Sequence, residues 1–187
     1  MKKELTLILG GARAGKSVLG ERLAGEASRV LYVATAEAKD EEMARRIEAH
    51  RARRPQAWQC LEEPIDLPEA IAAYEGTFDL LLLDCVTVWT SNVMLSAPEG
   101  VDVEAEALHR TERLLRCYED GDAAWVLISN EVGLGVVPPS VLGRRYRDLL
   151  GKVNQRLAAA ADRVLLVVAG LALDMKALGA QPIDRDI

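Results

Sequence analysis

The sequence predicts an α/β fold, in which a mostly parallel β-sheet is flanked by helices. Short runs rich in Leu, Ile and Val recur along its 187 residues, and segments of helical periodicity separate them. Each run is apolar at consecutive positions instead of alternate ones, which is typical of strands covered on both faces. Strands that alternate with helices in this way form parallel sheets between helical layers.

The periodicity gives the expected elements in chain order. Strands are predicted over residues 5–9, 30–34, 80–83, 125–128 and 164–168. Helices are predicted over residues 16–27, 40–53, 66–74, around 87–95, 103–118 and 140–161. Loops are predicted where Gly, Pro and acidic residues gather, at 97–100, 119–122 and 133–139. The tail from Gly179 is expected to be loosely ordered, and without a repeat or linker the chain 1–187 is expected to form one domain.

The charge balance argues against several classes of function. A formal net charge of −6, with a pI near 5.1, repels polyanions, so no nucleic-acid partner is expected. The longest apolar stretch, residues 164–173, is about half of the roughly 20 residues that span a membrane, so no membrane insertion is expected. Three cysteines without a C-x-x-C pair, and only two histidines, disfavour a disulfide framework and a zinc site. These features predict a soluble, cytoplasmic protein in which any anion binding is local.

A complete phosphate-binding loop follows the first predicted strand. It matches the pattern G-x-x-x-x-G-K-[ST] and opens a predicted helix. Its residues are Gly10, Gly11, Ala12, Arg13, Ala14, Gly15, Lys16 and Ser17. Glycines let successive N–H groups turn toward phosphate oxygens, and the helix N-terminus adds its positive dipole end. Lys16 would reach the β and γ phosphates, and the Ser17 hydroxyl is placed for Mg²⁺. We therefore expect a P-loop nucleotide site, and not a glycine turn that only joins strand to helix.

Acidic residues follow two further predicted strands. Asp84 ends the apolar run 80–83, at the edge of the sheet where open α/β folds bind ligands. It is predicted to hold the Mg²⁺ shell as a Walker B acid; the alternative is an N-cap for the helix around 87–95. Asn130 and Glu131 follow the strand 125–128 and are expected to face the same site. Glu131 could order Mg²⁺ or accept a substrate proton, or it could be a solvated loop acid.

One of the two histidines lies in a cationic segment. Residues 45–54 contain five arginines and one glutamate in a chain whose total charge is −6. His50 falls on the apolar stripe of the helix 40–53 with Met43 and Ile47, which on its own indicates a core histidine. The arginines change this interpretation, because guanidinium groups bind polyphosphate and disfavour imidazolium. A neutral imidazole beside a bound triphosphate could attack phosphorus. His109 has no such neighbours and is predicted to be structural or exposed.

Together these motifs resemble a known family. The chain is similar to the bifunctional adenosylcobinamide kinase and adenosylcobinamide-phosphate guanylyltransferase of cobalamin biosynthesis, from residue 5 to about residue 176. The P-loop alone is shared with many families, whereas the basic histidine helix together with the Asn-Glu-Val-Gly-Leu-Gly run is far more specific. The motifs that carry the resemblance are residues 10–17, 32–36, 40–55, 58, 62–64, 83–85, 129–138, 153–157 and 167–171.

The resemblance implies an activity, a site and an assembly. It implies a RecA-like P-loop fold and a homotrimer. His50 would take GMP from GTP, release pyrophosphate and hand GMP to adenosylcobinamide phosphate, while the kinase half would phosphorylate adenosylcobinamide with ATP or GTP. The residues expected to contact nucleotide are those of the loop 10–17 with Ala34, Thr35, Ala36, Arg51, Ala52, Arg53, Arg54, Glu62 and Asp84.

Two other functions compete with this hypothesis. A P-loop kinase for another small alcohol, in which His50 only contacts phosphate, is the main alternative. A GTP-binding switch would need an N-K-x-D motif, which the sequence lacks, and its only D-x-x-G, at 148–151, falls inside a predicted helix. Ala14 also stands where the family is expected to carry a serine, a change that removes a hydroxyl but no backbone donor. Residues that bind the corrinoid are not indicated; Trp89, Val93 and Met94 are better explained as helix core.

Overall fold

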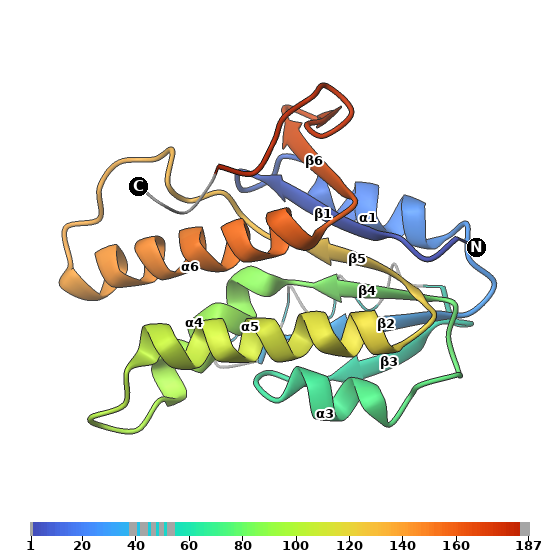
Figure 1. Cartoon of the computed structure of the whole chain (residues 1–187), viewed down its shortest axis with the longest axis horizontal. Coiled ribbons are helices and arrows are strands. Elements are labelled where there is room, and N and C mark those ends of the chain that lie inside the picture. Colours follow the sequence, from blue (N-terminus) through green and yellow to red (C-terminus); the bar gives the residue numbers. More distant parts are fainter. Residues whose placement is uncertain are drawn as a thin grey trace.

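The computed structural model describes residues 2–37, 41, 45, 48, 51 and 55–183. Within this part of the chain, seven strands form one sheet in the order β3-β2-β4-β5-β1-β6-β7 (Figure 1). The strands are β1 (Leu5–Gly10), β2 (Val30–Ala34), β3 (Gln59–Glu62), β4 (Leu80–Asp84), β5 (Ala124–Ile128), β6 (Arg163–Val168) and β7 (Leu171–Asp174). The first six are parallel and β7 is antiparallel to β6. The predicted α/β class and all five predicted strands are confirmed.

The helices agree with the expected positions, with small shifts at their ends. They are α1 (Lys16–Ala24), α3 (Leu67–Ala72), α4 (Val86–Ser96), α5 (Val103–Asp120) and α6 (Val141–Ala160). Side-chain caps fix two of the starts: Asp102 accepts from two N–H groups of α5 at 3.1 Å, and Ser140 accepts from Gly143 at the start of α6. The predicted loop 119–122 is wrong at its first two residues, because α5 continues to Asp120. The predicted helix 40–53 lies largely outside the described residues.

The helices form two layers on the sheet. α1 packs on one face, and α3, α4, α5 and α6 pack on the other (Figure 1). Gly20 lets α1 lie close to the sheet, since a Cβ there would come within 2.8 Å of the Ile128 side chain. The opposite layer buries Trp89 and Val93 of α4, each at most 2% exposed, which confirms that these residues are helix core. Both strand faces are therefore covered, as the consecutive apolar positions predict.

Two strands were not predicted, and both are short edge strands. β3 alternates between half-buried and exposed positions over four residues, so it has no continuous apolar run. Most of β7 lies within the apolar stretch 164–173 of the sequence, but Ala169 and Gly170, both with positive φ, turn the chain back between β6 and β7. Each of these strands pairs with a single neighbour at the margin of the sheet. An edge strand is less covered by neighbouring elements than a central strand, so it does not need a continuous run of apolar residues. This is why the sequence pattern of β3 and β7 is weak.

Parallel pairing brings the carboxyl ends of the strands to one edge of the sheet. Asp84 pairs with Ala34 of β2 and Ile128 of β5, while Ala34 also pairs with Glu62 of β3. Gly10 at the end of β1 belongs to the same edge. Ligands of open α/β sheets bind outside this edge. Among the described residues, no helix combines the length and apolar character needed to cross a membrane.

Candidate nucleotide-binding site

The loop between β1 and α1 has the backbone that a phosphate cradle requires. Gly15, the residue before α1, has φ 106°, a conformation that side chains disfavour. Gly10 cannot be replaced without displacement of backbone, because a Cβ there would lie 2.2 Å from the Val167 carbonyl oxygen. α1 then begins at Lys16, so its free N–H groups and its dipole face the loop. The predicted strand–loop–helix context is confirmed.

Contacts from two other strand ends hold this loop in place. The Glu131 N–H donates to the Gly10 carbonyl at 3.1 Å, and the Gly170 N–H donates to the Ala14 carbonyl at 3.0 Å. The first contact comes from the chain after β5, and the second from the β6–β7 turn. Both engage carbonyl groups of the loop, so neither contact occupies a loop N–H group; within the loop, the Ala14 N–H donates to the Gly11 carbonyl at 3.4 Å. Gly170 was not predicted to act here, because a contact across roughly 150 residues leaves no local sequence signal.

Lys16 lies at the base of the loop with its amine already oriented. The side chain is largely buried, and Nζ donates to the Gly11 carbonyl at 2.7 Å. Burial lowers the pKa of Lys16, while the nearby Cys85 and Asp84 oppose that shift. A phosphate oxygen near Gly11 would give the partly desolvated amine a full negative partner. Contact of Lys16 with the β and γ phosphates stays a prediction.

Asp84 is the last residue of β4 and is half-buried. Its Oδ2 accepts a hydrogen bond from the Tyr32 hydroxyl at 3.2 Å. The N-cap of α4 is Cys85 and not Asp84, so the capping alternative for Asp84 is wrong. Asp84 also lies near enough to Lys16 to affect its ionisation, as expected for an acid and a lysine that share a phosphate site.

The oxygen donors at this edge of the sheet are suited to magnesium, and not to a metal ion whose ligands all come from the protein. The half-buried hydroxyl of Ser17 and the carboxylate of Asp84 are hard oxygen donors, which Mg²⁺ prefers. In the described part of the chain no three His, Cys, Asp or Glu side chains come together as a metal site. Mg²⁺ is often held by one or two protein oxygens together with substrate phosphates and water. The residues present therefore suit an ion that arrives with a nucleotide.

A buried polar network joins the ends of β2, β3 and β4. The Thr35 hydroxyl accepts from the Cys85 N–H at 3.0 Å and donates to the Cys85 carbonyl at 2.8 Å. The Asn92 amide of α4 donates to the carbonyls of Thr35 and Pro64, at 2.9 and 3.2 Å. Thr35 and Asn92 are at most 7% exposed. Asn92 was missed at the sequence level, although a polar residue in an otherwise apolar helix is a signal, because a buried amide needs partners.

A second network orients the chain after β5. Asn154 of α6 accepts from the Ser129 hydroxyl at 2.7 Å and donates to the Asn130 carbonyl at 3.0 Å. The Asn130 N–H donates to the Thr87 hydroxyl at 2.7 Å. Glu131 is half-buried, and its carboxylate accepts from the Gly133 N–H at 2.6 Å. Asn130 and Glu131 therefore lie beside the P-loop as expected, while the role of the Glu131 carboxylate stays a prediction.

The remaining predicted contacts extend along the edge. Arg51 and Glu62 are exposed and form an ion pair with each other, and Ala34 and Thr35 are buried beside Asp84. β3 and β1 are four strand spacings apart in the sheet, roughly 19 Å, so Glu62 and the P-loop are at well-separated places on one edge. His50, Ala52, Arg53 and Arg54 lie outside the described residues. His109 is exposed on α5, in agreement with its prediction.

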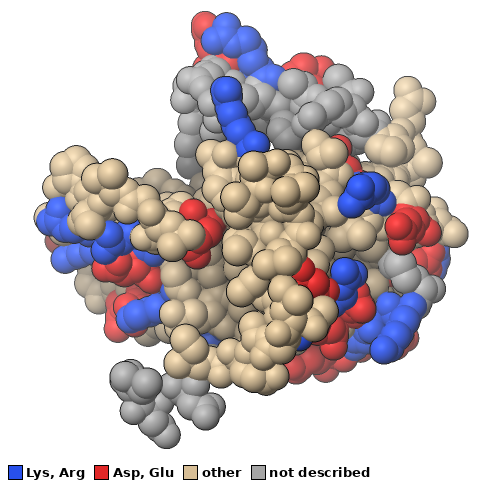
Figure 2. All heavy atoms as spheres, turned by 90° about the horizontal axis from the view of Figure 1, so that it is seen from above, with Lys and Arg blue, Asp and Glu red and all other residues tan. Residues whose placement is uncertain are grey.

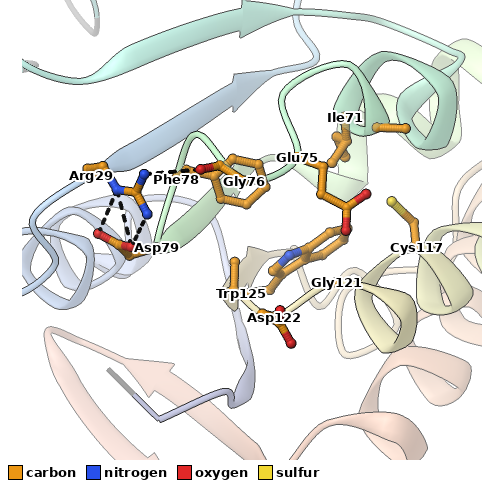
Figure 3. A pocket seen from close by; sticks show the side chains of 12 residues that line it. Arg29, Ile71, Glu75, Gly76, Phe78, Asp79, Cys117, Gly121, Asp122 and Trp125 are labelled. Atoms are coloured by element: carbon orange, nitrogen blue, oxygen red, sulfur yellow. Dashed lines mark hydrogen bonds and ion pairs between the residues drawn. The ribbon is translucent and has the colours of Figure 1, made fainter.

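A pocket of about 290 Å³ opens at the opposite edge of the sheet (Figure 3). Its lining includes Trp125, at the start of β5, with Phe78 and the Arg29–Asp79 ion pair. These residues are at or before the amino ends of strands, whereas the P-loop follows a carboxyl end. None of the predicted nucleotide-binding residues lines this pocket. It is separate from the candidate nucleotide site.

The fold and the loop together define a P-loop nucleotide-binding protein. A solved structure of a prototypical ATPase from the type III secretion system of pathogenic bacteria is similar in fold, with a TM-score of 0.58 and 12% sequence identity. The alignment covers 98% of this chain but 59% of that one, so the chain spans well under two thirds of the secretion ATPase. At this identity the likeness concerns the fold alone.

The comparisons of sequence are more specific. The profile of a family described as cobinamide kinase / cobinamide phosphate guanyltransferase matches residues 6–175. The chain is 47% identical over 172 residues to the bifunctional adenosylcobalamin biosynthesis protein CobP of Pseudomonas aeruginosa, covering 91% of this chain and 96% of that protein. It is 42% identical over 180 residues to the bifunctional adenosylcobalamin biosynthesis protein CobU of Escherichia coli, covering 92% and 99%. The chain belongs to the cobinamide kinase / cobinamide phosphate guanyltransferase family. The alternative of a P-loop kinase for another small alcohol, without guanylyl transfer, is not favoured.

Proposed function

We propose that this protein is a bifunctional enzyme of cobalamin biosynthesis that phosphorylates adenosylcobinamide and then transfers GMP from GTP to adenosylcobinamide phosphate. The observation that supports it most is the complete P-loop at the carboxyl edge of the sheet, with Asp84 beside it. Family membership over residues 6–175 names the acceptor class, which the geometry alone does not identify.

The P-loop supports the kinase step. Backbone N–H groups of residues 10–17 would hold the phosphates of ATP or GTP, and the Lys16 ammonium would neutralise the β and γ oxygens. Ser17 and Asp84 would hold Mg²⁺, which when bound draws charge from the phosphate oxygens. The acceptor hydroxyl of adenosylcobinamide forms a bond to the γ-phosphorus while the bond from that phosphorus to the bridging oxygen breaks, which releases ADP or GDP, and the hydroxyl proton passes to solvent. Because this transfer depends on positioning and charge, the fixed loop matters more than a reactive side chain.

We assign the guanylyl transfer to His50. A neutral imidazole nitrogen attacks the α-phosphorus of GTP, an N–P bond forms, and the bond to the bridging oxygen breaks to release pyrophosphate. A phosphate oxygen of adenosylcobinamide phosphate then attacks the same phosphorus and the N–P bond breaks, which gives adenosyl-GDP-cobinamide. The resemblance supports this assignment, as does the arginine cluster around His50 in the sequence. The residues proposed to contact nucleotide are those of the loop 10–17 with Ala34, Thr35, Ala36, Arg51, Ala52, Arg53, Arg54, Glu62 and Asp84.

Covalent labelling tests this function. The protein incubated with GTP labelled on the α-phosphate should gain a label that is stable to alkali and labile to acid. His50→Ala should abolish the label, and His109→Ala, which changes an exposed histidine of α5, should leave it intact. A wild-type protein that gains no label would show that the transfer does not proceed through a guanylyl-histidine.

We also propose a single domain that assembles as a cytoplasmic homotrimer. Exposed apolar side chains support an assembly: Val168, Leu171, Leu173 and Leu178 are between 49% and 76% exposed near the β6–β7 edge. Seen from above, the molecule shows a broad area without charged side chains (Figure 2). Exposed apolar side chains grouped at one edge are typical of an interaction site. Light scattering should give three times the chain mass of 20.4 kDa, and a monomer at micromolar concentration would contradict the trimer.

A further inference from the structure

Tyr32 is a buried tyrosine whose hydroxyl points to the proposed magnesium ligand. The residue is 2% exposed, and its hydroxyl lies 3.2 Å from Oδ2 of Asp84. An ionised carboxylate accepts hydrogen bonds and cannot donate them, so the phenol proton lies between the two oxygens. None of the hydrogen bonds among the described residues engages the other carboxylate oxygen, Oδ1. Asp84 therefore has one oxygen held by protein and one left for a ligand.

The sheet register explains why these two side chains meet. Tyr32 pairs with Leu82 and Ala34 pairs with Asp84 in the parallel ladder of β2 and β4. Tyr32 and Asp84 are thus diagonal neighbours on the same face of the sheet, the face covered by α1. Diagonal neighbours are roughly 7–8 Å apart at the backbone, a span that a tyrosine can bridge. Since α1 follows the P-loop, this face also presents Asp84 toward the phosphate site.

The ring of Tyr32 is held firmly enough to fix the hydroxyl. It packs in the cluster that contains Ile8, Leu82 and Ile128. It also stacks on Trp58, with ring centroids 6.4 Å apart and an interplanar angle of 23°. A ring confined on both sides keeps its hydroxyl in one place, and a hydrogen bond from a fixed donor limits rotation of the carboxylate.

We propose that Tyr32 is a positioning residue that holds the Asp84 carboxylate in the orientation that receives the magnesium ion of a bound nucleotide. The inference depends on the proposed function, because it takes Asp84 as the magnesium-binding acid. Partners that orient a metal ligand commonly affect metal affinity by roughly 10–100-fold when they are removed. A purely structural role for the Tyr32 hydroxyl predicts something different: a change in stability, with nucleotide affinity affected equally with and without magnesium.

Calorimetric titration separates these roles without relying on turnover. The probe is guanosine 5′-(α,β-methylene)triphosphate, whose bridging carbon blocks transfer of GMP. Its dissociation constant is measured with excess Mg²⁺ and again with EDTA. The dissociation constant in EDTA divided by that in Mg²⁺ is the magnesium gain, the factor by which magnesium strengthens binding. Tyr32→Phe should reduce the gain by roughly tenfold or more while leaving the affinity in EDTA unchanged. Tyr118→Phe is the matched control, since Tyr118 contacts Asp162 at 3.5 Å at the opposite edge of the sheet, and its gain should equal that of the wild type.

Asp84→Asn completes the experiment. It should lose the gain, and the double variant Tyr32→Phe, Asp84→Asn should lose no more than Asp84→Asn alone, because the hydroxyl acts through the carboxylate. If Asp84→Asn loses the gain and Tyr32→Phe keeps it, the positioning role is wrong while the magnesium role of Asp84 stands. If Asp84→Asn keeps the gain, the proposed magnesium role fails and the inference fails with it. Equal weakening in magnesium and in EDTA by Tyr32→Phe would also overturn the inference, and thermal melting verifies that each variant is folded.

Discussion

The Thr35 hydroxyl bridges both backbone groups of Cys85, accepting from its N–H at 3.0 Å and donating to its carbonyl at 2.8 Å. This clamp joins the chain after β2 to the start of α4, across the edge where Ala34 and Asp84 pair. Thr35 is fully buried, so water cannot replace the hydroxyl. This side-chain oxygen therefore continues the link between the two strands beyond the last backbone pair of the ladder.

Thr35→Val should destabilise the protein by roughly 1–3 kcal/mol, because it takes from the Cys85 N–H its hydrogen-bond acceptor. The Cys85 carbonyl loses one of two donors and still accepts from the Trp89 N–H at 3.1 Å. Thr35→Ser keeps the hydroxyl and should lose less. Thr111→Val is the matched control: Thr111 is also fully buried, but its hydroxyl donates to the Ala107 carbonyl of its own helix, so the loss should stay under about 1 kcal/mol. Urea unfolding measures all three. Equal losses for Thr35→Val and Thr111→Val would contradict the clamp.

Lys16→Ala should weaken nucleotide binding by roughly 10–100-fold, which corresponds to the loss of a hydrogen bond from a charged donor. The amine is the charged side chain at the base of the loop, and burial has already removed part of its hydration. Titration calorimetry with ATP and GTP measures the change. Lys152→Ala, which removes an exposed lysine paired with Glu104, should leave both affinities unchanged. Phosphorylation of cobinamide should fall in parallel, and an unchanged rate in Lys16→Ala would remove the P-loop from the kinase step.

Cys85 should make the protein less stable at alkaline pH. Burial, and to a smaller extent the negative charge of Asp84, raises the pKa of the Cys85 thiol from 9.0 to about 11. Between these values the unfolded chain releases the thiol proton and the folded chain keeps it, so the free energy of unfolding falls as pH rises from 9 to 11. Two pKa units correspond to at most about 2–3 kcal/mol, with less expected for a half-buried side chain.

Urea unfolding between pH 7.5 and 10.5 tests this pH dependence. Cys85→Ser removes the thiol and should give a flatter decline than the wild type. Cys60→Ser changes an exposed cysteine and should follow the wild-type curve. Parallel curves for Cys85→Ser and the wild type would show that the thiol does not contribute to alkaline unfolding.

Asn154→Leu should loosen the chain after β5. The substitution leaves the Ser129 hydroxyl and the Asn130 carbonyl without their shared amide, at a cost of roughly 1–3 kcal/mol. Hydrogen exchange of peptides that cover residues 129–135 should speed up, and nucleotide affinity should fall, because Glu131 supports the P-loop through the Gly10 carbonyl. Gln155→Leu changes the exposed neighbour on α6 and should alter neither measurement. Unchanged exchange in Asn154→Leu would show that the loop is held by other contacts.

The sequence predicts those parts of the site that are formed by consecutive residues. The P-loop is one uninterrupted segment between a strand and a helix, so its pattern and context predict its shape and its ligand. Asp84 could be placed because a run of leucines ends at a carboxylate, and parallel pairing takes such ends to one edge. The alternative that it caps α4 could not be removed until the structure assigned the cap to Cys85.

The supporting contacts could not be predicted, because each joins residues far apart in the chain. Asn92 reaches Thr35 and Pro64 across 57 and 28 positions, and Gly170 reaches Ala14. Nothing next to Asn92 in the sequence names its partners; the sequence shows only that a buried amide needs them. β3 and β7 were missed for a related reason, since short edge strands are defined by pairing with a neighbour and not by their own composition.

The sequence by itself determined the α/β class, the phosphate-binding loop and the family, because these depend on local periodicity and on contiguous motifs. Only the tertiary structure decided the strand order, the clamp between Thr35 and Cys85, and the hydrogen bond from Tyr32 to Asp84. These features arise when the sheet register places distant side chains on one face, and the buried setting then requires each polar atom to find a partner. The loop that binds phosphate is thus encoded locally, whereas the residues that orient it are selected by the packing of the whole sheet.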